Sequence, residues 1–213
     1  MPNSSNANSN PHYTICLILY DQFDLLEVAA PLSLFSMFPD NFRIVTVSEH
    51  GRPVASQQGN KLSADDSLYT LEDFDVLIVP GGDGIKKAVE SDNLVNWIKK
   101  QYQPSRYICA FCTGAALLAE AGILRHRSAT TNKQQYRWVT GFGENIDWFP
   151  VARWVRDGHI FTSSGKSAAM DLSLALIATL LNEESARKAA INAEYIWVND
   201  PGEDPFAPLH IVQ

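Results

Sequence analysis

The sequence predicts an α/β protein with a mostly parallel sheet that helices cover on both faces. Apolar runs of strand length alternate with segments of helical spacing along the 213 residues. Apolar residues make up 46% of the chain and charged residues 19%, as in soluble globular proteins. A chain of this length can bury a core of its own without disulfides or metals.

The first four segments alternate in the expected way. Residues 13–21, YTICLILYD, form an apolar run typical of a buried strand. Residues 24–38 have helical spacing, with Pro31 compatible with a helix only near a kink or in the first turn. Residues 42–49 predict a strand, and the polar residues 53–68 predict a short hairpin or loop.

The middle of the chain continues the pattern. Residues 75–84, DVLIVPGGDG, predict a strand that enters a glycine-rich turn. Residues 91–102 predict an amphipathic helix with a serine or aspartate cap at its start. Residues 105–112 predict a buried strand, and the small residues of 113–122 predict a helix closed by a glycine.

The last third predicts a hairpin followed by two helices. Within 148–165, two strands meet at Asp157-Gly158, a strong hairpin signal. Residues 167–181 and 183–197 predict the closing helices. Neither a repeat nor a long linker interrupts the chain, so we expect a single domain.

Net charge and cysteine content indicate which classes of partner and which cellular compartment to expect. The net charge is −7 without any lysine- or arginine-rich run, which disfavours nucleic acid and anionic membranes as partners. No run is long enough to cross a membrane, and residues 1–12 lack the pattern of a signal peptide and predict a disordered tail before a domain at 13–213. The cysteines, Cys16, Cys109 and Cys112, predict free thiols in the cytoplasm. The five histidines show no metal-ligand spacing, and we expect no cofactor.

Cys112 is the strongest candidate for chemistry. It lies where a predicted strand turns into a helix, the geometry of a nucleophile elbow at the carboxyl edge of the sheet. The amides and dipole of a helix that begins at Thr113 would lower the pKa of the thiol. Two alternatives stay open: a buried apolar cysteine, or a redox pair of Cys109 and Cys112 in C-x-x-C.

Three further positions could complete the site. Glu27 lies in the apolar segment LLEVAAP, where a buried carboxyl is either paired or protonated, and a neutral Glu27 could donate a hydrogen bond to a thiolate. Gly81 and Gly82 could present amides that form an oxyanion hole with the amide of Thr113. The alternatives are a solvated helix face for Glu27 and an ordinary turn for the glycines.

The segments together resemble the ThiJ/PfpI superfamily, a group of class I glutamine-amidotransferase-like folds that includes isocyanide hydratases and the parkinsonism-associated deglycase. The similarity covers roughly residues 13–197 and is carried by DLLEVAAP, DVLIVPGGDG, ICAFCTGAALLAEAGIL, ATTN and VRDGHIFTSSGKSAAMDLSLALIA. It implies a flavodoxin-like three-layer sandwich, usually homodimeric. It also implies Cys112 as nucleophile, Glu27 as its acidic partner, and Gly81 and Gly82 on the oxyanion side.

The chain departs from its relatives in two places. Asn132 stands where many relatives have a histidine after two threonines; it can bind substrate but cannot act as a general base, so peptidase activity is not expected. Isocyanide hydratases carry an aspartate with a different following sequence where this chain has Glu27, so hydratase activity is possible without being indicated. The chain ends at Gln213 without a helix-turn-helix segment, which argues against a DNA-binding regulator.

These observations predict a cysteine-dependent hydrolase, hydratase or lyase that attacks a small electrophile through Cys112. Glu27 would move the proton, and the amides of Gly82 and Thr113 would stabilise negative charge. The alternative is a protein without turnover that senses oxidants through Cys112. A ligand-binding remnant of a regulator's sensor domain is a third reading.

Overall fold

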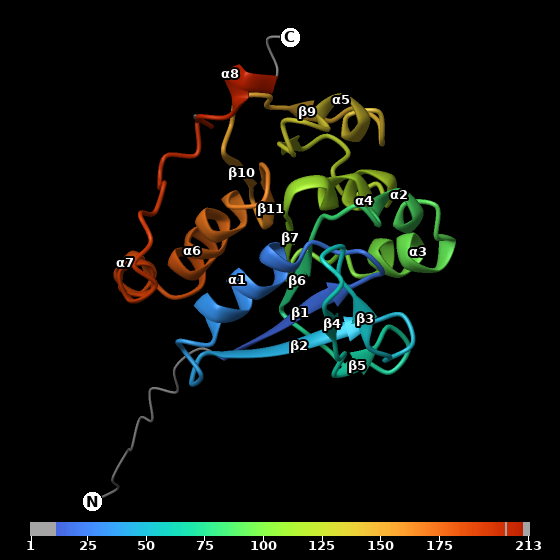
Figure 1. Ribbon diagram of the computed structural model, residues 1–213, viewed down its shortest axis with the longest axis horizontal. Coiled ribbons are helices and arrows are strands. Elements are labelled where there is room, and N and C mark those ends of the chain that lie inside the picture. Colours follow the sequence, from blue (N-terminus) through green and yellow to red (C-terminus); the bar gives the residue numbers. More distant parts are fainter. Residues whose placement is uncertain (1–11, 203, 211–213) are drawn as a thin grey trace, which may run out of the picture.

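Seven strands form the central sheet of the computed structural model, which describes residues 12–202 and 204–210 (Figure 1). The strand order is β10-β11-β7-β6-β1-β2-β5. Their bounds are β1 Tyr13–Leu19, β2 Phe42–Ser48, β5 Asp66–Ser67, β6 Val76–Val79, β7 Tyr107–Ala110, β10 Trp154–Asp157 and β11 Ile160–Ser163. Only the pairing of β10 with β11 is antiparallel, so the predicted mostly parallel sheet is confirmed. The predicted tail, residues 1–12, lies outside the described residues apart from His12.

Helices cover both faces of the sheet, as predicted. One face carries α1 Leu25–Phe35, α6 Ala168–Leu180 and α7 Glu183–Asn192, which pack on one another (Figure 1). The other face carries α2 Ile85–Ala88, α3 Asp92–Lys100 and α4 Ala115–Glu120. The result is the predicted flavodoxin-like three-layer sandwich. In the described part of the chain, no helix combines the length and apolarity that a membrane crossing requires.

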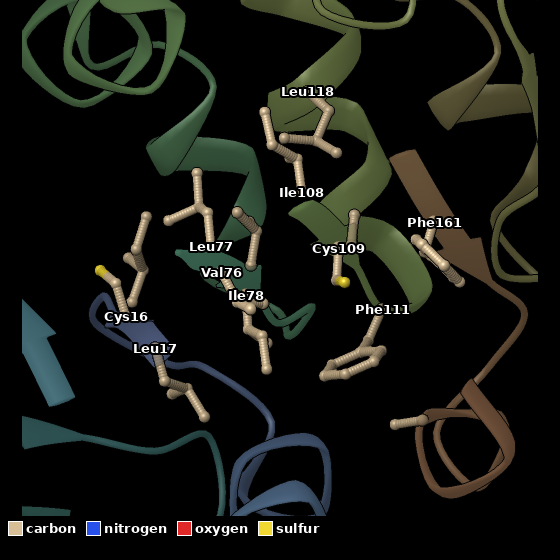
Figure 2. Packing of buried hydrophobic residues seen from close by; sticks show 14 of the residues in the cluster. Cys16, Leu17, Val76, Leu77, Ile78, Ile108, Cys109, Phe111, Leu118 and Phe161 are labelled. Atoms are coloured by element: carbon tan, nitrogen blue, oxygen red, sulfur yellow. The ribbon is translucent and has the colours of Figure 1, made fainter. Parts of the chain in front are cut away.

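The central strands are apolar because both of their faces are covered. All four residues of β6 are fully buried, and Ile108, Cys109 and Ala110 of β7 are fully buried beside them. Figure 2 shows Cys16 and Cys109 among these hydrophobic side chains. Burial raises the pKa of both thiols far above the ordinary range, so these two cysteines are core residues.

Smaller elements complete the chain outside the main sheet. The polar segment 53–68 contains the expected short hairpin. The hairpin pairs β3 Val54–Ala55 with β4 Lys61–Leu62, and the other small elements are β8 Ser128–Ala129, β9 Asp147–Trp148, α5 Tyr136–Val139 and α8 Ala207–His210. The turn at Asp157-Gly158 joins β10 to β11, as predicted.

The structure places Pro31 within its helix and shortens one predicted helix. Pro31 lies inside α1, beyond its first turn, where it cannot donate the usual amide to the carbonyl of Glu27. The helix predicted over 183–197 ends at Asn192. The helix ends at a C-terminal cap, in which Glu194 has φ of 49° and the amides of Glu194 and Tyr195 donate back to the carbonyls of Ile191 and Ala190. Buried Asp171 of α6 then holds the residues that follow: its carboxylate accepts hydrogen bonds from the Tyr195 hydroxyl at 3.0 Å and the Val198 amide at 2.9 Å.

Asp171 also belongs to a buried ion-pair network that fixes the C-terminal segment. Arg153 contacts Asp171 at 2.9 Å and Asp204 at 3.5 Å, and all three side chains are at least nine-tenths buried. Charges buried this deeply are costly unless paired, so the network holds residues 195–198 and Asp204 in place. The segment consequently brings α8 close to the loop that follows β11.

Candidate active site

The site lies at the carboxyl edge of the sheet, between strands whose connections leave in opposite directions. The chain leaves β1 for α1 on one face and leaves β6 for α2 and α3 on the other, so a crevice opens between these strands. Glu27 enters this crevice from α1, Gly81 from the turn after β6, and Cys112 from the turn after β7. The fold therefore brings together three residues that are far apart in sequence.

Cys112 occupies the predicted elbow. It directly follows Phe111 at the end of β7 and starts a 3-10 turn, Cys112–Gly114, that leads into α4. Its φ of 51° is the left-handed conformation, which costs a residue with a side chain on the order of 1–3 kcal/mol. Hydrogen bonds hold it there: its amide donates to Ser164 O at 3.2 Å, and the Thr131 hydroxyl donates to its carbonyl at 2.8 Å.

The packing under the elbow requires a small residue. A Cβ added to Gly114 would lie 2.5 Å from the carbonyl oxygen of Val79 and 2.7 Å from that of Pro80. Both distances are far below ordinary van der Waals contact. The absence of a side chain at Gly114 therefore lets the elbow approach the end of β6 and brings the sulfur next to Glu27.

Glu27 is fully buried, and its two carboxyl oxygens have different surroundings. Oε2 accepts a hydrogen bond from the Gly81 amide at 2.6 Å, whereas Oε1 has no partner with hydrogen-bond geometry within the described chain. Burial raises the pKa of Glu27 to about 8, the amide of Gly81 opposes the rise, and the charge of Asp24 adds to it. The side-chain interaction with the Cys112 thiol lowers the pKa of Glu27, so the ionisations of the two groups are coupled.

Burial also raises the pKa of the Cys112 thiol well above its ordinary value, and repulsion from Glu27 raises it further. The backbone amides of Lys166 and Thr113 hydrogen-bond the sulfur and oppose the shift. The direction is opposite to the lowered thiol pKa predicted from the sequence. The helix after the cysteine is too short and too deeply buried for its dipole to outweigh the loss of water. Because negative charge is disfavoured on both groups, the pair carries at most one charge near neutral pH.

The two glycines serve the site differently from the prediction. The Gly81 amide donates to Glu27, and the Gly82 amide donates to the Thr113 hydroxyl at 3.2 Å. Both amides therefore have partners within the protein and are not free for an oxyanion. A Cβ at Gly81 would lie 2.9 Å from Glu27 Oε2 and 2.7 Å from Thr113 Oγ1, so this glycine allows the carboxyl to approach the turn.

Asn132 lies next to the sulfur. Its Nδ2 is 3.1 Å from Cys112 Sγ, and its Oδ1 accepts a hydrogen bond from the Gln135 amide at 2.9 Å. The second bond fixes which end of the amide faces the cysteine. The sulfur is therefore surrounded by the N–H groups of Asn132, Thr113 and Lys166.

Two residues near the site were missed in the sequence analysis. Asp24 caps α1, is almost fully buried, and contacts the Lys166 ammonium at 3.2 Å; a capping aspartate before a helical run was the available signal. Lys166, with φ of 31°, follows β11 and directs its amide to the sulfur. The sequence contains no local pattern that predicts this amide contact, because it depends on how β11 lies beside β7.

Comparison with known proteins places the chain in a family. A family model described as the DJ-1/PfpI family matches residues 13–179. The chain belongs to the DJ-1/PfpI family. It is 29% identical to isonitrile hydratase of Pseudomonas putida over 93% of this chain and 86% of that protein. A crystal structure of a ThiJ/PfpI family protein from Pseudomonas syringae has a TM-score of 0.80 at 26% identity and covers 99% of this chain and 89% of that one.

The family also contains regulators. The chain is 31% identical to an HTH-type transcriptional regulator of Pseudomonas aeruginosa over 92% of this chain, and spans 53% of that protein's length. Family membership thus confirms the resemblance without assigning one activity. The homodimer, the cytoplasmic location and the single domain at 13–213 stay predictions.

Glu27→Gln should remove a pH dependence of stability. The raised pKa means that Glu27 binds its proton more tightly in the folded protein than in the unfolded chain. The contribution of this proton to the free energy of unfolding is therefore complete below about pH 4.5 and declines as the pH rises to about 8. The full decline is on the order of 5 kcal/mol. Urea unfolding at several pH values between 5 and 8 measures it. We expect a wild-type slope that the glutamine variant lacks; equal slopes in the two proteins would contradict a raised pKa.

Proposed function

We propose that the protein is an enzyme that adds Cys112 to a small electrophile and releases the product by hydration or hydrolysis. The observation that carries this proposal is the coupled pair: a buried carboxyl whose pKa is about 8 lies beside the sulfur of an elbow cysteine. A base whose pKa is near the working pH is suited to take a proton during attack. The similarity to isonitrile hydratase supports the same class.

The proposed step uses Glu27 as the base. Of the two groups, Glu27 ionises first, so the single negative charge of the pair resides on the carboxylate. As the sulfur bonds to the electrophilic carbon, the thiol proton passes to Glu27 and then to the substrate atom that gains electrons. Water then attacks the same carbon, the carbon–sulfur bond breaks, and the thiol is restored.

Negative charge that develops on the substrate would be stabilised by N–H groups beside the sulfur. The amides of Thr113 and Lys166 and the Nδ2 of Asn132 already face Sγ. Donors fixed in a buried site need no reorganisation during the reaction, which is why such groups are effective. In this proposal Lys166 and Asn132 take the role that the sequence suggested for Gly82.

Cys112→Ser should abolish turnover, and the matched control Cys109→Ala should retain it. We would screen isonitriles, nitriles, thioesters and small dicarbonyl compounds, then measure the steady-state rate of both variants. The serine hydroxyl is far less acidic than the thiol, so we expect a loss of at least about a thousandfold. The wild-type rate should rise with pH to a plateau above about pH 8, as Glu27 ionises. Full turnover by Cys112→Ser would exclude the mechanism.

A second candidate function is oxidant sensing without turnover. It is favoured by the free Oε1 of Glu27 and the N–H groups around the sulfur, which could hold oxygen atoms added to Sγ. The raised thiol pKa weighs against it, because the thiolate is the form that peroxide oxidises. We therefore rank it second.

Mass spectrometry after mild hydrogen peroxide separates the two candidates. The enzyme proposal predicts that Cys112 is oxidised no faster than an ordinary exposed cysteine and that at least one substrate class is turned over. Rapid addition of two oxygen atoms confined to Cys112, together with no activity in the substrate screen, would favour the sensor instead. Glu27→Gln is the control, because it removes the carboxylate base and leaves the shape of the site nearly unchanged.

A further inference from the structure

A cleft of about 350 Å³ lies beside Cys112. Three of its lining residues contact the cysteine directly: Asn132 through Sγ, Ser164 through the backbone amide of Cys112, and Lys166 through an amide that faces the sulfur. The remaining lining residues are Lys133, Gln134, Gly165, Ser167, Phe206 and His210. A small molecule in this cleft would therefore lie against residues that contact Cys112.

The chemistry of the lining is polar and basic. Amide, hydroxyl, amine and imidazole side chains predominate, and Phe206 is the one purely hydrocarbon side chain in the set. The set contains two lysines and neither aspartate nor glutamate, although the whole protein has 24 acidic residues against 17 lysines and arginines. The local charge therefore differs in sign from the net charge of the chain.

Lys133 is the most unusual of these residues. Its side chain is almost fully buried, and its ammonium donates to the Thr130 hydroxyl at 2.8 Å and to the carbonyl oxygen of Ala152 at 2.6 Å. Within the described residues, no carboxylate forms an ion pair with it. Burial lowers its pKa to about 8, so much of its charge persists at neutral pH. A buried ammonium bound only by uncharged oxygens gains most from an anion that arrives beside it.

The neighbouring charges leave room for such an anion. Asp204 attracts the Lys133 ammonium and Arg153 repels it, but Asp204 is itself paired with Arg153. Lys166 is paired with Asp24, yet its side chain is 58% exposed and can reorient. Asp24 would keep the amides of Gln57 and Gln58 as donors if Lys166 moved to a ligand.

We propose that the site takes a small electrophile bearing a carboxylate or a similar single anionic group, which Lys133 and Lys166 hold while Cys112 attacks the reactive carbon. This inference rests on the proposed function, because it concerns the substrate class of the same cysteine. The anionic group would distinguish this protein's substrates from uncharged, apolar electrophiles. Lys133 and Lys166 are specificity residues in this proposal, and Glu27 keeps its role as base.

Two alkylating reagents that differ mainly in charge test the proposal. Iodoacetate and iodoacetamide react in the same way: the sulfur forms a bond to the methylene carbon, iodide leaves, and the thiol proton passes to Glu27 or to solvent. Both reagents meet the same fraction of ionised thiol, so the ratio of their rate constants is independent of the pKa of Cys112. The rate constants are measured at pH 7 by mass spectrometry of the Cys112 peptide, in the native protein and in the same chain unfolded in urea.

We expect the iodoacetate-to-iodoacetamide ratio to be about tenfold higher in the native protein than in the unfolded chain, the size of one charge-assisted hydrogen bond. Lys133→Met and Lys166→Met should each lower the native ratio toward the unfolded value. Lys100→Met is the matched control, since this exposed lysine ends α3 at the opposite edge of the sheet, and it should leave the ratio unchanged. If Lys133→Met does not fold, Lys166→Met alone decides the outcome.

Three results would overturn the proposal. Equal ratios in the native and unfolded chains would exclude an anion preference while leaving the reactive cysteine intact. A raised ratio that both lysine variants retain would exclude this cleft as its source. Native protein in which neither reagent labels Cys112 would overturn the proposed function and this inference together.

Discussion

The removal of water from one carboxyl group and one thiol determines how this site behaves. Glu27 is fully buried beside the nearly buried Cys112, and burial raises the pKa of each group. The pair consequently holds a proton that a solvated pair would lose at neutral pH. A site of this kind does not store a preformed thiolate. Instead it keeps a base next to a thiol and ionises the sulfur as the new bond forms.

The backbone around the pair is arranged to tolerate this burial. Gly81 and Gly114 permit contacts that a Cβ would block, and the contact at Gly81 lets its amide donate a hydrogen bond to Glu27. The left-handed conformation of Cys112 is strained, but bonds from Thr131 and to Ser164 hold it. Strain of this kind persists when the surrounding structure over-determines the geometry, and the β7 and β11 strands provide that support.

Much of the fold follows from the sequence because the strands are apolar on both faces and the helices have clear periodicity. The sheet, the Asp157-Gly158 hairpin and the elbow at Cys112 could all be predicted in this way. The proximity of Glu27 and Asn132 to the sulfur depends on strand order rather than on local pattern, so Glu27 was expected there only from the family resemblance, and the contact of Asn132 could not be predicted. The direction of the thiol pKa was predicted wrongly, because sequence shows a helix dipole but not the loss of solvent that opposes it.

The protonation state of Glu27 is the quantity on which the whole account rests. Carbon NMR of protein labelled with ¹³C at the glutamate carboxyl carbon measures it directly, with Glu27→Gln identifying the signal by its absence. The account predicts one glutamate that titrates near pH 8, and its midpoint should rise when Cys112→Ala removes the thiol, because the interaction with that thiol lowers the pKa of Glu27. A Glu27 signal that titrates near pH 4.5 with the ordinary glutamates would contradict it.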